Sequence, residues 1–148
     1  MREMRETPTS SINPLISLSS QGKKVIIPGS AHGELLVANE PISFWGGYDY
    51  HTGEIIDRRH PLSGQCAARK ILAVPFTRGS STTTAVLLEA VRAGTAPAAI
   101  ITTGVDSFFA LASIVADEMY QRPIPIVALS ATEFQQLHSG DEFTIENG

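Results

Sequence analysis

The chain has 148 residues, of which 43% are hydrophobic and 18% are charged, and this size and composition predict one domain with its own core. The formal net charge of −4 argues against a nucleic-acid partner, because phosphate binding needs clustered Lys and Arg, whereas the pairs Arg58-Arg59 and Arg69-Lys70 are isolated. The single cysteine, Cys66, can by itself form neither an internal disulfide nor the ligand set of an iron–sulfur cluster, and this cysteine usage indicates a cytoplasmic protein.

The N-terminal end is polar and contains Pro8 and Pro14, which predicts a flexible arm over residues 1–20, followed by a single domain over residues 21–148. No stretch has the length and apolar character of a membrane-spanning helix, so a membrane partner is not expected either. Beyond the arm, the two halves of the chain have different patterns.

The first half is typical of β-structure. Short runs of β-branched or aromatic residues are bounded by turn residues such as Pro and Gly, as in a compact antiparallel or barrel-like sheet. The expected strands are residues 25–27, 35–37 and 42–45, with a possible short strand at 54–56.

The second half indicates strands that alternate with helices. The expected strands are residues 71–74, 99–101 and 126–129, and the expected helices are residues 80–93 and 108–119. Ser80 or Ser81 is expected to cap the first helix and Gly94 to end it, and Asp106 or Ser107 is expected to cap the second. This order predicts an α/β fold in which a small β-rich half packs on a parallel strand–helix layer.

The stretch TRGSSTTT, at 77–84, lies between a predicted buried strand and a predicted helix. Ligands of open α/β sheets bind at the carboxyl ends of strands, and helix N-termini present free N–H groups. Gly79 lets the backbone approach a ligand, so the spacing is typical of an anion-binding loop, although the Lys and second Gly of a P-loop are absent. The alternative is that Ser80 and Ser81 only cap a helix, and the residues alone leave both interpretations open.

Two other stretches carry candidate residues. Asp57 precedes His60 by three residues in a loop, where a carboxylate can orient an imidazole, although such loop residues more often make turns. Gly46 and Gly47 follow aromatic residues and predict a tight turn with close backbone approach, with aromatic packing against a partner chain as the alternative. The remaining histidines show no ligand spacing, so no metal site is predicted.

In order, these pieces resemble the small domain of the aconitase X family. The motifs that carry the resemblance are FWGGYD at 44–49, residues 53–57, HPLSG at 60–64, Pro75, and RGS at 78–80. The resemblance extends over residues 22–129. It implies a swivelling β/β/α domain that closes over a larger cluster-binding part. The chain would then be the small subunit of a heterodimeric iron–sulfur hydro-lyase, inactive alone, with the cluster on the large subunit and none on this chain.

The resemblance also implies residue roles. Ser80, the first serine after Gly79, would be the base that abstracts a proton from a β-hydroxy acid, while a cluster iron on the partner acts on the leaving hydroxyl. Thr82 stands where the familiar aconitase turn has Arg, which weakens the case for carboxylate binding from that position. The expected substrate-binding residues are Arg78, Gly79, Ser81, Thr82, Gly47 and His60.

Aconitase X members act on one of two substrates, cis-3-hydroxy-L-proline or mevalonate 5-phosphate. The first type is often a fused chain and the second a large and small pair, so a separate chain favours mevalonate 5-phosphate. The threonine-rich loop after Gly79 looks bacterial and favours cis-3-hydroxy-L-proline, which is the expected substrate. Two other functions remain open: a stand-alone module that binds a small anion, and a scaffold that docks another protein through Phe44, Trp45 and Tyr48.

Overall fold

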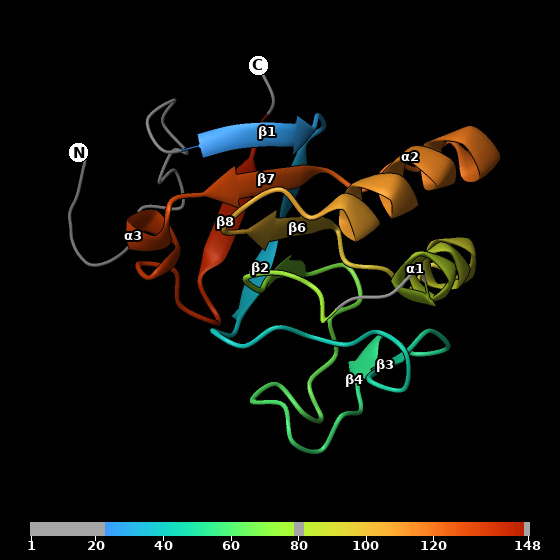
Figure 1. The fold of residues 1–148 in the computed structure, drawn as a ribbon, viewed down its shortest axis with the longest axis horizontal. Helices are drawn as coiled ribbons and strands as arrows, with labels where there is room; N and C mark the ends of the chain where they lie inside the picture. The colour runs from blue at the N-terminus through green and yellow to red at the C-terminus, as the bar shows by residue number, and fades with distance from the viewer. Residues whose placement is uncertain (1–22, 79–81, 147–148) are drawn as a thin grey trace.

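The computed structural model describes residues 23–78 and 82–146, which form a six-stranded sheet of order β1-β7-β6-β5-β2-β8 and a two-stranded sheet β3-β4 (Figure 1). The strands of the large sheet are β1 (Lys23–Ile27), β2 (Ala31–Val37), β5 (Ile71–Ala73), β6 (Ala99–Thr102), β7 (Ile126–Leu129) and β8 (Glu142–Ile145). The small sheet contains β3 (Tyr48–Asp49) and β4 (Glu54–Ile55). The helices are α1 (Thr82–Ala93), α2 (Ser107–Tyr120) and α3 (Ala131–Phe134).

The centre of the large sheet confirms the predicted α/β class. Strands β5, β6 and β7 are parallel neighbours, joined by α1 and α2, which pack together on one face of the sheet (Figure 1). Asp106, one of the two predicted candidates, caps α2. Gly94, the residue after the end of α1, has a positive φ of 80°. Glycine suits this left-handed exit because it has no Cβ.

The predicted placement of the first strands is wrong in two respects. β1 and β2 do not form a separate antiparallel or barrel-like sheet, because β1 pairs with β7, and β2 pairs with β5 in parallel and with β8. Residues 42–45 are not a strand: only Ile42 makes an isolated bridge, to Thr77. The apolar run there reflects burial instead, since Phe44 is fully buried and its ring stacks on that of Tyr48.

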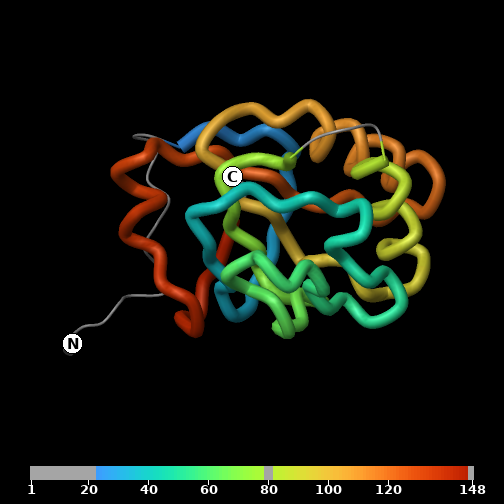
Figure 2. The backbone as a smooth tube through the Cα atoms, turned by 60° about the horizontal axis from the view of Figure 1, so that its bottom comes forward, coloured from blue at the N-terminus to red at the C-terminus, as the bar shows by residue number. Residues whose placement is uncertain are grey.

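Side chains alternate between two cores, one on each face of the sheet. Leu36, Leu72 and Ile100 belong to the core beneath α1 and α2, whereas their neighbours Ile71 and Ile101 belong to the core that includes Phe134, Leu137 and Phe143. Because both faces are covered, the central strands have continuous apolar sequences. The segment 38–68 contributes to the first core, and Figure 2 shows it, coloured cyan to green, in front of the sheet and next to α1.

The predicted arm, residues 1–20, lies outside the described residues. A single domain over 21–148 stays a prediction.

Candidate functional site

The carboxyl ends of β5 and β6 meet at one edge of the sheet, where the two connecting segments are hydrogen-bonded to each other. The Thr103 N–H donates to the Pro75 carbonyl at 3.2 Å. Thr77 donates to the Asp106 carboxylate twice, from its backbone N–H at 2.7 Å and from its hydroxyl at 2.9 Å. Ile42 bridges to Thr77 from the other side. Residues 40–47, 75–78 and 103–106 are named the carboxyl-edge surface below.

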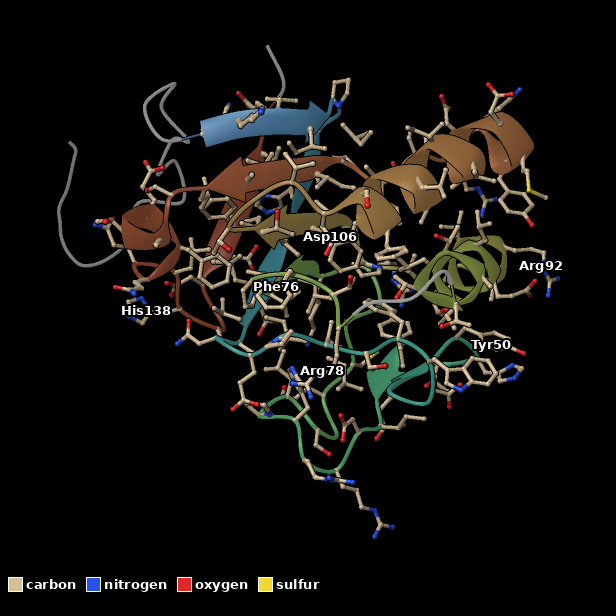
Figure 3. The ribbon with its side chains drawn as sticks, viewed as in Figure 1. Tyr50, Phe76, Arg78, Arg92, Asp106 and His138 are labelled. Atoms are coloured by element: carbon tan, nitrogen blue, oxygen red, sulfur yellow. The ribbon has the colours of Figure 1, made fainter. Side chains whose placement is uncertain are left out.

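Arg78 is the predicted substrate-binding residue that the structure places most clearly on this surface. Its backbone N–H donates to the Ile42 carbonyl at 2.8 Å, which holds the chain against residues 40–47. Its side chain is exposed, on the segment between β5 and α1, with Asp106 at the start of α2 (Figure 3). Within residues 23–78 and 82–146, no ion pair or hydrogen bond engages its guanidinium. A guanidinium in this position can bind a carboxylate or phosphate with two parallel hydrogen bonds.

The predicted base and two of its neighbours cannot be placed. Ser80, Gly79 and Ser81 lie outside the described residues. Thr82, the next predicted contact, is the first residue of α1 and is half-buried. Arg78 and Thr82 are therefore the residues of the predicted anion-binding stretch 77–84 that directly precede and follow residues 79–81.

Gly47 makes the close backbone approach that its sequence predicts. It is buried in a tight turn, its N–H donates to the Phe44 carbonyl at 3.3 Å, and a Cβ there would lie 2.1 Å from the Ser43 carbonyl oxygen. Its own carbonyl accepts from the Ile56 N–H at 2.9 Å. The side chain of Tyr48, the next residue, is also buried, and this burial raises the pKa of its hydroxyl group. Gly47 thus shapes the turn, and both of its backbone polar groups are already bonded.

His60 is buried, and both of its ring nitrogens contact backbone groups. Nδ1 accepts from the Leu62 N–H at 3.1 Å, so Nε2 carries the proton and donates to the Glu40 carbonyl at 3.3 Å. Asp57 does not orient this ring, because its Oδ1 accepts from the Arg59 N–H at 3.0 Å. His60 therefore ties the loop 57–62 to residues 40–47.

Sequence reasoning missed the apolar character of the carboxyl-edge surface. Trp45 is 70% exposed, Phe76 51% and Val105 62%, one on each of its three segments. Of these three residues, only Trp45 was predicted to contact a partner; Phe44 and Tyr48, which were predicted to do so with it, are buried. Phe76 and Val105 lie in the loops that follow the buried strands β5 and β6, and their position near the carboxyl ends of adjacent strands was the available signal.

Cys66 and the other metal-ligating side chains do not fit an iron–sulfur cluster. Cys66 is exposed and its thiol donates to the Thr52 carbonyl at 3.3 Å. In the part of the chain that the structure describes, no group of three or more His, Cys, Asp or Glu is arranged to hold a metal ion. None of the described helices is long and apolar enough to cross a membrane.

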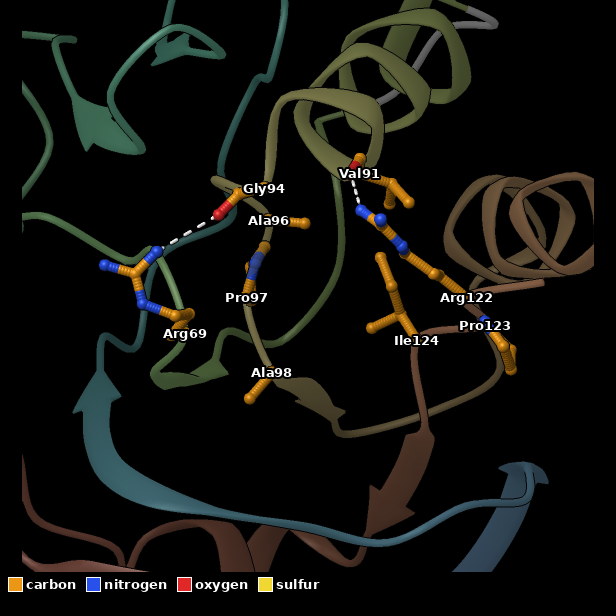
Figure 4. Close-up of a pocket in the computed structure, with 9 residues that line it drawn as sticks. All are labelled: Arg69, Val91, Gly94, Ala96, Pro97, Ala98, Arg122, Pro123 and Ile124. Atoms are coloured by element: carbon orange, nitrogen blue, oxygen red, sulfur yellow. Dashed lines mark hydrogen bonds between the residues drawn. The ribbon is translucent and has the colours of Figure 1, made fainter. Parts of the chain in front are cut away.

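A cavity of about 240 Å³ lies at the opposite edge of the sheet, where the parallel strands begin (Figure 4). Arg69 donates to the Gly94 carbonyl at 3.1 Å and Arg122 to the Val91 carbonyl at 3.3 Å, so both arginines hold the C-terminal end of α1. The cavity does not include any of the predicted site residues. The wall between the arginines is formed by Ala96, Pro97, Ala98, Pro123 and Ile124.

Comparison with known proteins shows that the chain is similar to two kinds of dehydratase. The chain is 48% identical over 106 residues to the cis-3-hydroxy-L-proline dehydratase of Pseudomonas aeruginosa, covering 72% of this chain and 18% of that protein. It is 40% identical over 101 residues to the phosphomevalonate dehydratase small subunit of Methanothermobacter thermautotrophicus, covering 68% of this chain and 77% of that protein.

A solved structure shows the same fold. The crystal structure of Thermococcus kodakaraensis aconitase X matches with a TM-score of 0.74 at 30% identity, covering 84% of this chain and 91% of that chain. The chain spans 18% and 20% of the length of the two hydroxyproline dehydratases that it matches. Residues 20–148 match the aconitase X swivel domain, and the chain therefore belongs to the aconitase X swivel-domain family.

Proposed function

We propose that this chain is the swivelling part of a dehydratase that removes water from cis-3-hydroxy-L-proline, and that it is inactive without a larger part that carries an iron–sulfur cluster. The observation that carries this proposal is the 48% identity over 106 residues to the cis-3-hydroxy-L-proline dehydratase of Pseudomonas aeruginosa. A lone thiol cannot supply the four ligands of a cluster, so the larger part has to hold it. We place the assembled enzyme in the cytoplasm, where its thiol stays reduced.

In this proposal Ser80 takes a proton from the substrate, and Arg78 with residues 79, 81 and 82 binds its anionic group. The guanidinium of Arg78 supports this assignment, because it is exposed and pairs with none of the residues that the structure describes, and the substrate carries a carboxylate. In this proposal Gly47 and His60 act indirectly, because they hold residues 40–47 in place. The Ile42 carbonyl of that segment accepts from the Arg78 N–H.

The apolar residues of the carboxyl-edge surface support a shared site with the larger part. Trp45, Phe76 and Val105 each expose more than half of their surface, around the segment that bears Arg78. Exposed large side chains beside a polar site are typical of surfaces that a partner covers. Coverage there would also exclude water from the substrate.

The test is to co-express the chain with the cysteine-rich larger part, to purify the pair without oxygen, and to assay water loss from cis-3-hydroxy-L-proline. Turnover by the pair and none by either part alone is the expected result. A pair that assembles but leaves this substrate unchanged would overturn the proposed substrate.

A second candidate substrate is mevalonate 5-phosphate. It is favoured by the 40% identity to a phosphomevalonate dehydratase small subunit of which the chain covers 77%, a protein of comparable size. The same preparation assayed with mevalonate 5-phosphate separates the two substrates.

The isolated chain gives a further check. A swivelling part should show little thermal stabilisation by carboxylates or phosphates until it is paired. Strong stabilisation of the isolated chain would instead indicate a stand-alone anion-binding module, since ligand that binds only the folded state raises its stability.

A further inference from the structure

Asp106 makes more contacts than a helix cap needs. Its Oδ1 accepts from the N–H groups of Phe108 at 3.0 Å and Phe109 at 3.2 Å, which satisfies the first turn of α2. Its Oδ2 accepts from the N–H and the hydroxyl of Thr77. Asp106 is only 8% exposed and Thr77 only 6%, so these four hydrogen bonds are shielded from water.

The second oxygen fixes the segment that bears Arg78. Thr77 is held by Asp106 on one side and bridges to Ile42 on the other. Arg78 follows at once, and its N–H donates to the Ile42 carbonyl at 2.8 Å. The direction in which the Arg78 side chain leaves the surface therefore depends on where Thr77 is held. One carboxylate joins the start of α2 to the segment between β5 and α1.

We propose that Asp106 is a positioning residue that acts through Thr77 to hold Arg78 in its substrate-binding orientation; this rests on the proposed function. A cap alone would need only one oxygen. The two roles are assigned to different oxygens of the same side chain, so substitutions can separate them.

Asp106→Asn separates the two roles. Asn is as good an N-cap as Asp, so its amide oxygen can still accept from the first turn of α2. Its NH₂ group is then directed at the two donors of Thr77 and cannot accept from them. Thr77→Val tests the same link from the other side, because it removes only the hydroxyl donor.

The matched control is Ser113→Ala. Ser113 is also on α2 and fully buried, and its hydroxyl donates to the Ile124 carbonyl at 2.7 Å and accepts from the Ile124 N–H at 2.8 Å. It joins α2 to the start of β7, at the opposite edge of the sheet. Its loss should lower thermal stability without changing how the substrate binds.

In the assembled dehydratase, we expect Asp106→Asn to raise KM about tenfold with a smaller change in kcat, as Arg78→Ala does. If Asp106 acts through Arg78, Asp106→Asn has little further effect on KM in the Arg78→Ala background. Additive effects of the two substitutions, or an unchanged KM in Asp106→Asn, would overturn the proposal. In the double variant, the effects of Ser113→Ala and Arg78→Ala on KM should be additive.

Hydrogen exchange in the unpaired 148-residue chain tests the inference without activity. Asp106→Asn and Thr77→Val should speed exchange of the Thr77 and Arg78 amides at least tenfold, whereas Ser113→Ala should leave both at the wild-type rate. Unchanged exchange in Thr77→Val and Asp106→Asn would reject the positioning role even if the enzyme is active. An inactive wild-type pair with accelerated exchange in these variants would reject the proposed substrate and keep the positioning role.

Discussion

The two edges of the parallel sheet hold the ends of helices by opposite chemistry. At the carboxyl edge, the Asp106 carboxylate accepts from backbone N–H groups of Thr77 and of the first turn of α2. At the other edge, Arg69 and Arg122 donate to carbonyls at the end of α1. This contrast follows from helix direction, since helix starts present free N–H groups and helix ends present free carbonyls.

The difference teaches that the cavity and the predicted site residues lie at different edges of the sheet. The cavity of about 240 Å³ lies at the edge with the carbonyls, where the arginines are already bonded. At the carboxyl edge, by contrast, the guanidinium of Arg78 is exposed and pairs with none of the described residues. We therefore expect substitutions at the carboxyl edge to change turnover or substrate binding, and those at the cavity to change only stability.

The largest expected effect is that of Ser80→Ala. Loss of a positioned base should lower kcat by a factor on the order of 10²–10⁴, with assembly intact. Anaerobic assays of the pair, with size-exclusion chromatography for assembly, measure both. Ser113→Ala is the control, because the Ser113 hydroxyl is bonded to Ile124 at the opposite edge of the sheet. Unchanged turnover in Ser80→Ala would remove Ser80 as the base.

Gly47→Ala should destabilise the carboxyl-edge surface itself. The added Cβ would meet the Ser43 carbonyl at 2.1 Å, so the turn has to shift, and overpacking of this kind costs about 1–3 kcal/mol. Urea denaturation of the chain measures the loss. Gly104→Ala, where a Cβ would meet nothing within 4 Å, should be close to neutral. Equal stability of the two variants would contradict the close approach.

Arg78→Ala should raise KM about tenfold, which corresponds to about 1.4 kcal/mol of lost binding. The reason is the loss of a charge-assisted contact to the substrate carboxylate. Steady-state kinetics of the pair test this. Arg92→Ala provides a control at a distant exposed arginine, which pairs with Glu89 at 2.6 Å. A KM that rises equally in both variants would point to overall charge rather than to a site.

Arg122→Ala should have the smallest effect. Its loss removes a cation from the end of α1 and should lower stability by about 0.3–1 kcal/mol. Thermal denaturation measures this change, and kcat and KM of the pair should stay at wild-type values. A tenfold change in KM would show that the cavity edge takes part in substrate binding and would end the contrast between the two edges.

Much of the fold could be predicted because local sequence patterns indicate the central strands and helices. The buried strands β5, β6 and β7 have continuous apolar runs, and the helices between them have apolar residues at helical spacing. The strand predicted at residues 42–45 is wrong because Ile42 and Phe44 are apolar for a different reason: they are buried in the core without belonging to a strand. The α3–β8 region has no such strong run and was not foreseen.

The candidate site was only partly predictable. Arg78 was expected at the carboxyl edge because ligands bind where parallel strands end, and the structure places it there. His60 was expected to contact substrate, and this stays a prediction; in the structure its ring contacts the backbone of Glu40, 20 residues earlier. For Asp106, capping was favoured over a place at the border of the site, because its second partner, Thr77, is 29 residues away and no local pattern indicates that contact.

The sequence by itself determined which segments become the central strands and helices, and at which edge the polar loop between β5 and α1 would lie. Periodicity and chain direction decide these features, and both are local properties. Only the tertiary structure decided that β1 and β2 join the same sheet, that the arginines close the opposite edge, and that one carboxylate links two loops. Such pairings depend on how distant segments pack, and no local pattern specifies which donor meets which acceptor.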